Sequence, residues 1–237
     1  MASTFFGLHI GSSALSSFQV ATNTTANNIA NVKTTGYTRQ EATLQAKDAI
    51  NVTARYGSVG TGVTVTSIKQ QRDLYYDNKY WENNSCYGRY EQKLYYMEQI
   101  QNYFKDNGSS VKGFSSVFSQ MFSDLDTLRS KPSDKTVRNQ FISSAQSLCT
   151  YFNQMSDNLS KLQDDCNEEI RNNVDKINSI SEKISLLNKE INQIETGTGV
   201  EAGSLRDERA NLIDSLSKIV NVSYNAVSYT HLRAHET

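Results

Sequence analysis

Residues 26–40 read ANNIANVKTTGYTRQ, and within them the chain changes from helical to strand periodicity. Three asparagines, Asn27, Asn28 and Asn31, crowd around one isoleucine. Asparagine is tolerated at the end of a helix, and Gly36 suits a left-handed or turn conformation just after it. A helix end explains one asparagine but not three. We therefore expect the side-chain amides to bridge adjacent chains.

Upstream of this stretch, apolar and small residues recur at spacings that alternate between three and four. This set, which we call the seam, consists of Leu8, Gly11, Leu15, Phe18, Thr22, Thr25, Ile29 and Val32. The spacing predicts a helix with a coiled-coil face of about three and a half heptads. A helix of this polarity is marginal alone in water, so the seam requires a partner helix.

Downstream, within residues 37–70, RQEATLQA (39–46) and VTVTSIKQ (63–70) alternate with period two, which predicts a β-hairpin or two strands with a long turn. Helical spacing then resumes in an unusually aromatic pattern from Tyr76 to Phe104. A shorter helix should end near Lys131 and Pro132, because proline disfavours the α conformation in the residue before it. Ser133 or Asp134 can cap the next helix.

One helical pattern then continues to Ile194. Its apolar positions are Val137, Phe141, Leu148, Phe152, Met155, Leu159, Leu162, Cys166, Ile170, Val174, Ile177, Ile184, Leu187, Ile191 and Ile194. A further helix is expected over SLRDERANLIDSLSKIV (204–220), and VNVSYNAV (220–227) is expected to begin a strand. Apolar positions on these long helices favour intramolecular core over partner binding.

These patterns predict a mainly α fold: long antiparallel heptad helices, a small β-hairpin element, and an N-terminal coiled-coil assembly helix set apart from the rest. We expect residues 1–36 to form the assembly helix and residues 37–226 to form a helical rod-like domain with the β element.

Composition excludes several classes of function. The 237 residues carry a net charge of −1 and show no cluster of lysine and arginine, which argues against a nucleic-acid or membrane partner. Catalytic motifs are absent, and we expect no enzyme, cofactor or metal site. Cys86, Cys149 and Cys166 are scattered and are expected to be reduced, half-buried thiols.

The last eleven residues, VSYTHLRAHET (227–237), break the composition abruptly. A back-translation of this peptide resembles one frame of a transposon-type sequencing adaptor, so we interpret it as an artefact and give no functional weight to His231 and His235. On this interpretation the natural gene continues beyond Ala226.

The seam followed by NNIANVKTTGYTRQ resembles the bacterial flagellar axial proteins, the family of rod, hook and hook-associated proteins. The motif comprises Asn27, Asn28, Ile29, Ala30, Asn31, Gly36, Tyr37, Thr38, Arg39 and Gln40. Its GYTRQ ending is similar to hook-associated proteins of the hook–filament junction. GTGVTVTSIKQQRDLYYDNKYW (60–81) and SLRDERANLIDSLSKIVNV (204–222) are similar to the same group.

The resemblance implies a structural, extracellular role. Members leave through the flagellar export channel without a cleaved signal peptide, and their terminal helices pair only in the assembled tube. Leu8, Leu15, Phe18 and Ile29 would then pack against a C-terminal helix and neighbouring subunits, and Gly11 would allow close approach. The resemblance also implies that Asn27, Asn28 and Asn31 form hydrogen bonds at the helix end. The implied partners are identical subunits in a ring, the hook protein, a second junction protein and an export chaperone.

Two alternatives remain open. The chain could be another axial protein of the hook, rod or flagellin type, because these proteins share the N-terminal seam. It could also be a cytosolic coiled-coil scaffold. The C-terminus of the complete gene discriminates, since an axial protein should end in a second heptad helix that complements the seam.

Overall fold

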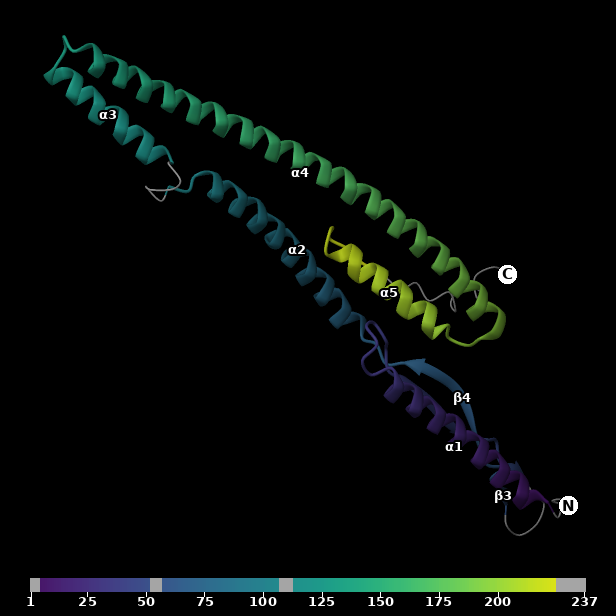
Figure 1. Cartoon of the computed structure of the whole chain (residues 1–237). Coiled ribbons are helices and arrows are strands. Elements are labelled where there is room, and N and C mark those ends of the chain that lie inside the picture. The colour runs from purple at the N-terminus through teal and green to yellow at the C-terminus, as the bar shows by residue number, and fades with distance from the viewer. Residues whose placement is uncertain (1–4, 52–56, 107–112, 225–237) are drawn as a thin grey trace. The chain divides into compact units, whose positions relative to one another are not determined.

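The computed structural model describes residues 5–51, 57–106 and 113–224 (Figure 1). The elements, in chain order, are α1 (Phe6–Ala30), β1 (Gln40–Ala46), β2 (Ile50–Asn51), β3 (Ser58–Val59), β4 (Val63–Gln70), α2 (Leu74–Tyr103), α3 (Phe114–Ser130), α4 (Lys135–Thr198) and α5 (Gly203–Ser217). The fold is mainly α, as predicted. The chain divides into two compact units: one combines the chain up to Ser85 with the chain from Ile177 onward, and the other is Cys86–Lys176.

The predicted hairpin is present in the first unit. β1 pairs antiparallel with β4, from Gln40 opposite Gln70 to Ala46 opposite Val63, and the register shifts between Thr43 and Leu44. β2 and β3 form a second, very short antiparallel pair. Gly62, at φ +106°, precedes β4 and lies so near α1 that a Cβ atom on it would be 2.3 Å from Ser13 Oγ.

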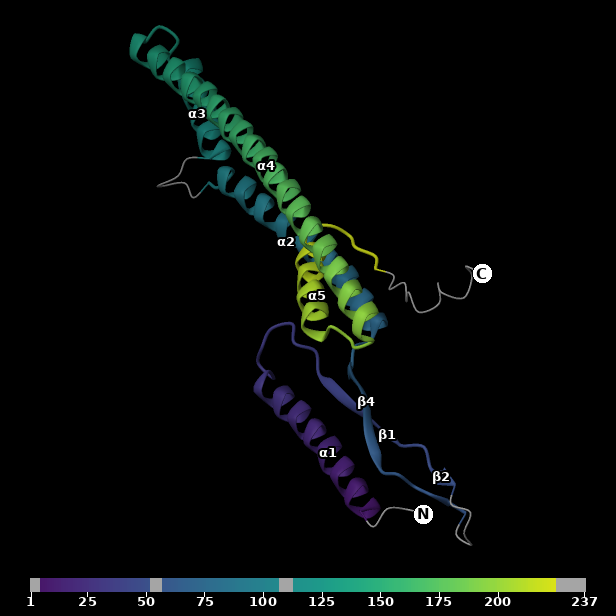
Figure 2. The ribbon, with the colours of Figure 1, turned by 90° about the vertical axis from the view of Figure 1, so that its right-hand side faces the viewer.

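α1 packs against this hairpin and is not set apart from it (Figure 2). Buried Ser17 donates a hydrogen bond from Oγ to the carbonyl oxygen of Val63 (3.2 Å), and Thr24 is also buried. The covered face of α1 is itself a heptad: Ile10, Ala14, Ser17, Ala21, Thr24, Asn28 and Asn31. This covered face lies roughly 110° around the helix from the seam, at 3.6 residues per turn. α1 therefore has one face for the hairpin and another that remains exposed.

The helical part of the first unit has Trp81 at its centre, with 2% of its surface exposed. Its indole Nε1 donates to Asp214 Oδ1 of α5 (2.6 Å), and Asn84 Nδ2 donates to the fully buried hydroxyl of Ser217 (2.8 Å). α5 runs antiparallel to the end of α4. Glu195 of α4 receives two hydrogen bonds from the Arg206 guanidinium (2.6 and 2.8 Å).

In the second unit, α2 and α3 each pair with α4. Gln92 Nε2 and Tyr96 Oη of α2 both donate to Glu169 of α4. The ring of Phe114, at the start of α3, contacts Phe152 of α4. The predicted stop before Pro132 is correct, since α3 ends at Ser130. Asp134 caps α4 by accepting a hydrogen bond from Thr136 N (2.8 Å).

The predicted core of α4 is partly confirmed. Met155, Leu162, Leu187 and Ile191 are buried, together with Ile180, which the pattern did not include. However, Phe152, Leu159, Ile170, Val174 and Ile194 are exposed. An apolar stripe that covers about a third of a helix surface is wider than the contact that one neighbouring helix makes.

Three other expectations were wrong. The aromatic pattern on α2 does not form core: Tyr76, Tyr80, Tyr87, Tyr90, Leu94, Met97 and Phe104 are exposed. α5 ends at Ser217, and no strand begins in residues 220–224. Cys86 and Cys149 are exposed, and only Cys166 is half-buried.

The tail at 227–237 lies outside the described residues. Among the helices that are described, none combines the length and the hydropathy needed to cross a membrane.

Candidate functional site: the end of α1 and the seam

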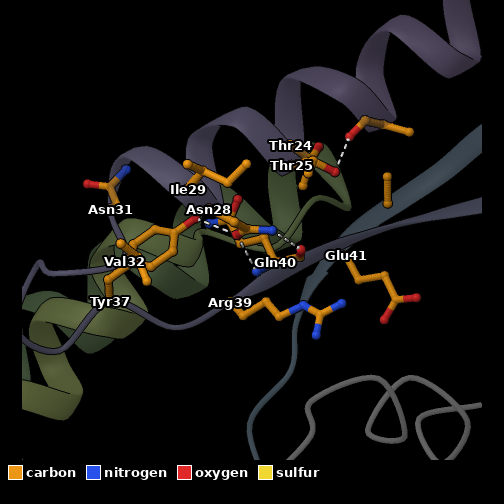
Figure 3. Close-up of a pocket in the computed structure, with 12 residues that line it drawn as sticks. Thr24, Thr25, Asn28, Ile29, Asn31, Val32, Tyr37, Arg39, Gln40 and Glu41 are labelled. Atoms are coloured by element: carbon orange, nitrogen blue, oxygen red, sulfur yellow. Dashed lines mark hydrogen bonds between the residues drawn. The ribbon is translucent and has the colours of Figure 1, made fainter.

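Asn28 is the centre of the motif at the end of α1. Its Nδ2 donates to the carbonyl oxygen of Gln40 (2.8 Å), and its Oδ1 accepts from the backbone N–H of the same residue (2.9 Å). The amide thus binds the first residue of β1 as a neighbouring strand would. Because Gln40 starts β1, this pair of hydrogen bonds fixes where the hairpin leaves α1 (Figure 3).

Tyr37 adds a third partner. Its hydroxyl donates to Asn28 Oδ1 (2.8 Å) and accepts from Asn27 Nδ2 (3.2 Å). Burial raises the pKa of the Tyr37 hydroxyl above its ordinary value, and the negative charge of nearby Asp207 raises it further. The hydroxyl therefore stays protonated and able to donate throughout the physiological pH range.

Asn31 caps the end of the helix. Its Nδ2 donates to both the carbonyl oxygen and Oδ1 of Asn27 (3.0 and 2.9 Å), and its own Oδ1 accepts from Thr34 Oγ1 (3.2 Å). The three asparagines thus have three different sets of partners, all within the chain. The expected hydrogen bonds at the helix end are confirmed.

The turn after α1 contacts α5. Gly36 has φ +78°, and a Cβ atom on it would lie 1.8 Å from Asn211 Oδ1, so only glycine fits. Thr38 donates its backbone N–H to Asp207 Oδ2 (3.3 Å). The motif is thereby joined to a helix more than 160 residues away in the sequence.

Gln70, at the end of β4, completes this connection. Its Nε2 donates to the carbonyl oxygen of Gly203 and to Asp207 Oδ1, both at 2.9 Å. Asp207 is buried and receives hydrogen bonds from Thr38, just before β1, and from Gln70, at the end of β4. We call the cluster of Asn28, Tyr37, Gln40, Gln70 and Asp207 the joint.

A groove of about 590 Å³ lies beside the joint, between the C-terminal half of α1 and β1 (Figure 3). It is lined by Ala21, Thr24, Thr25, Asn28, Ile29, Asn31, Val32, Tyr37, Arg39, Gln40, Glu41 and Ala42. Thr25, Ile29 and Val32 belong to the seam, so the groove and the seam are continuous. A helix that lies along the seam would reach the joint.

All eight seam positions are exposed. Leu8, Leu15 and Val32 leave 69%, 71% and 77% of their surface accessible. Gly11 has open space around it, as a site for close approach by another helix requires. Val32 lies beyond the last helical residue, Ala30, so the helical part of the seam ends at Ile29.

The remaining motif positions have different surroundings. Ala30 and Arg39 are exposed, and Arg39 lines the groove without an ion pair to any residue that the structure describes. No group of three histidine, cysteine, aspartate or glutamate side chains suited to a metal ion occurs within residues 5–51, 57–106 and 113–224. The site offers hydrogen bonds and apolar contact.

Sequence reasoning missed the distant half of the joint. Gln70, Asp207 and Asn211 were not among the candidate residues, although SLRDERANL was noted as a family-like segment. Asp207 and Glu208 are adjacent acidic residues that look alike in the sequence. Only the burial of Asp207 distinguishes them.

Comparison with known families matches two segments. The family described as flagellar hook-associated protein FlgK helical domain matches residues 97–231, and the family described as flagella basal body rod protein matches residues 8–38. The second match includes the seam and most of the motif.

Curated proteins give a consistent result. The chain is 34% identical to flagellar hook-associated protein 1 of Bacillus subtilis over 232 residues, which cover 95% of this chain and 45% of that protein. It is 32% identical to the protein of the same name from Salmonella typhimurium and 30% identical to that from Escherichia coli, over 89% of this chain in each case. Those matches cover 37% and 38% of the two proteins. The chain thus spans less than half the length of these relatives.

Proposed function

Because this chain belongs to the family of flagellar hook-associated protein FlgK, we propose that it is a structural subunit of the bacterial flagellum at the junction between hook and filament. The observation that carries the proposal is the exposed seam of α1, which leads into a groove beside the joint. The role assigned is mechanical: the seam polymerises, and the joint holds the end of α1 and the hairpin against α5. No catalytic step is part of it.

Exposure of the seam supports an assembly role. An exposed apolar heptad of this length on one helix is unfavourable in water and is characteristic of a surface that another helix covers. We propose that a C-terminal helix of the complete protein and neighbouring subunits cover Leu8, Leu15, Phe18 and Ile29. Gly11 would allow the backbone of the covering helix to approach α1 closely.

The joint supports the second half of the role. Asn28 and Asp207 tie the end of α1 to the hairpin and to α5 through hydrogen bonds that are half-buried. Such bonds resist rotation about the turn, because each broken bond leaves a polar group without a partner. Load on α1 would therefore reach the hairpin and α5 through the joint. The boundary between an assembly helix (1–36) and a rod-like domain (37–226) belongs to this proposal.

The proposed partners are identical subunits arranged in a ring, the hook protein, a second junction protein and an export chaperone. The proposed location is the extracellular flagellum, reached by export without cleavage of the N-terminus. Rod and hook proteins are the main alternative, and residues 8–38 match the family of flagella basal body rod proteins. The match of residues 97–231 favours the hook-associated group.

Deletion of the complete gene in its motile host tests the proposal. We expect cells that build hooks but release flagellin into the medium. Normal filaments on the deletion strain would refute the junction role.

A second test addresses the seam directly. Leu15 and Phe18 are replaced by aspartate in the full-length gene, and Ser16→Asp with Gln19→Asp serves as a matched control on exposed positions off the seam. We expect the L15D/F18D protein to appear in the medium without filament assembly, while the control assembles normally. Filaments of ordinary length with L15D/F18D would show that the seam does not polymerise.

A further inference from the structure

The seven residues that follow α5, 218–224, lie on the first unit as a segment that we call the strap. Exposure alternates along it: Val220, Val222 and Tyr224 are half-buried, whereas Asn221 and Ser223 are exposed. Such alternation is expected of an extended chain that has one side against a surface. The strap thus keeps the alternation of the strand that the sequence predicted here, although no strand pairs with it in the described part of the chain.

Tyr224 holds the far end of the strap. Its ring meets the ring of Trp81 edge to face, with the centroids 6.0 Å apart and the planes at 83°. The guanidinium of Arg209 lies over the same ring, with Cζ 5.4 Å from its centroid. Tyr224 therefore contacts both α2 and α5. It is one of the side chains that exclude water from Trp81, the largest buried side chain among the described residues.

The strap is held by fewer contacts than α5. Within the described ranges, no hydrogen bond reaches residues 221–224. α5, in contrast, receives hydrogen bonds from Trp81 on Asp214 and from Asn84 on Ser217. Segments with few main-chain hydrogen bonds and few buried contacts open at a lower free energy than the rest of a domain. The strap is therefore the first part of this region that should detach.

From these contacts we propose that the strap opens on its own, with Tyr224 leaving Trp81, while α2, α4 and α5 stay folded. Opening lets water reach Trp81 without breaking its hydrogen bond to Asp214. A displacement of the residues that follow Tyr224 would then release the strap before it disturbs α5. This conformational device does not depend on the proposed function.

The fluorescence of Trp81 tests the proposal, because Trp81 is the only tryptophan in the chain. Acrylamide quenching and far-ultraviolet circular dichroism of the 237-residue chain are measured under reducing conditions at increasing urea concentration. We expect the quenching constant to rise at least about twofold at urea concentrations that leave the helical signal unchanged. Quenching that changes only together with the helical signal would refute independent opening.

Variants of Tyr224 test its part in closing the strap. Tyr224→Ala removes the ring and should raise the quenching constant at least about twofold without urea, with the helical signal unchanged. Tyr224→Phe keeps the ring and should resemble the parent chain. Ser223→Ala is the matched control, since it changes an exposed neighbour on the same strap.

Two results with Tyr224→Ala would overturn the proposal. Loss of the helical signal would show that the strap is an integral part of the helical fold and does not open separately. An unchanged quenching constant would show that Tyr224 does not shield Trp81.

Arg209 has a test of its own. Arg209→Gln removes the cation from the Tyr224 ring and should raise the quenching constant by a smaller factor, about 1.5-fold. Arg209 also donates to Asn188 Oδ1 (2.9 Å), so Asn188→Ala removes that contact alone and should leave quenching unchanged. Equal effects of the two variants would refute the role given to Arg209. Because all these measurements use the purified chain, their outcome is independent of the flagellar assignment.

Discussion

Asn28 binds both main-chain polar groups of Gln40, with its Nδ2 at 2.8 Å from the carbonyl oxygen and its Oδ1 at 2.9 Å from the nitrogen. The side-chain amide of Asn28 therefore makes the two hydrogen bonds that an adjacent strand would make to the first residue of β1. The same Oδ1 accepts from Tyr37, so one side chain determines the path of the chain between α1 and the hairpin.

Replacement of Asn28 by alanine should lower the free energy of unfolding by about 1–3 kcal/mol, because it leaves half-buried groups of Gln40 and Tyr37 without partners. Urea denaturation measures the change. Asn27→Ala is the matched control, since Asn27 is exposed, and it should cost clearly less. Equal losses in the two variants would show that the hydrogen bonds to Gln40 carry no special weight.

Replacement of Gly36 by alanine should destabilise the chain by about 2 kcal/mol or more, because the φ of +78° disfavours a Cβ atom and that atom would overlap Asn211. In G36A/N211G the overlap is removed, and we expect a residual cost of about 1 kcal/mol from φ alone. Gly199→Ala is the control: Gly199 has φ +69° with open space around it, so only the cost of φ should appear. Thermal denaturation of the three variants checks this order.

The joint should weaken at high pH through Tyr37. The raised pKa of this hydroxyl means that the folded state disfavours the phenolate. The contribution to stability is therefore complete below the ordinary tyrosine pKa of about 10 and is lost as the pH rises through the higher folded value. The parent chain and Tyr37→Phe should differ in free energy of unfolding by about 1 kcal/mol at pH 7. This difference should disappear once the pH exceeds the folded pKa of Tyr37.

Asp207 provides the control for this titration. Its negative charge contributes to the raised pKa of Tyr37, so in a D207N background the same difference should disappear at a lower pH. Urea denaturation at several pH values gives both curves. A difference independent of pH in the parent chain would mean that the Tyr37 hydroxyl is not involved.

The contact between Glu195 and Arg206 should be sensitive to acid. The hydrogen bonds from Arg206 lower the pKa of the Glu195 carboxyl, so its contribution is present above the ordinary glutamate pKa and is lost as the pH falls through the lower folded value. Glu195→Ala should cost about 1–2 kcal/mol at pH 7, because two charge-assisted hydrogen bonds and the contact with Ala202 N are removed.

The surface pair Lys79–Glu82 is the matched comparison for that variant. Both side chains are more than half exposed, so Glu82→Ala should change stability by less than about 0.5 kcal/mol. As the pH falls below the ordinary glutamate pKa and through the lower folded value, the cost of Glu195→Ala should disappear. A cost that does not decrease as the pH is lowered would contradict the assignment.

Local patterns in the sequence were sufficient for much of the fold. Alternating residues gave both long strands, the proline at 132 gave the end of α3, and Gly36 gave a left-handed turn. Each of these features depends on a few neighbouring residues whose backbone preferences agree. The seam, which the pattern predicted to need a partner helix, is exposed in the described part of the chain. Its larger apolar residues, and not its spacing, distinguish it from the smaller residues that face the hairpin.

Other features depended on which faces meet. The aromatic pattern of α2 was expected in the core, yet it is exposed, while the covered side carries Gln92 and Tyr96. Hydrophobic periodicity identifies a face that needs cover but does not identify what covers it. Asp207 could not be recognised for a similar reason, since an acidic residue on a helix is ordinarily solvated.

The sequence by itself determined the mainly α class, the hairpin, the family motif and the exposed seam, because these are encoded in the spacing of residues close together along the chain. Only the tertiary structure decided that α1 lies on the hairpin, that Asp207 ties the motif to α5, and that α2 buries its polar side. These contacts join residues that are up to 169 positions apart, and their formation depends on side-chain packing and hydrogen-bond geometry that no local pattern contains.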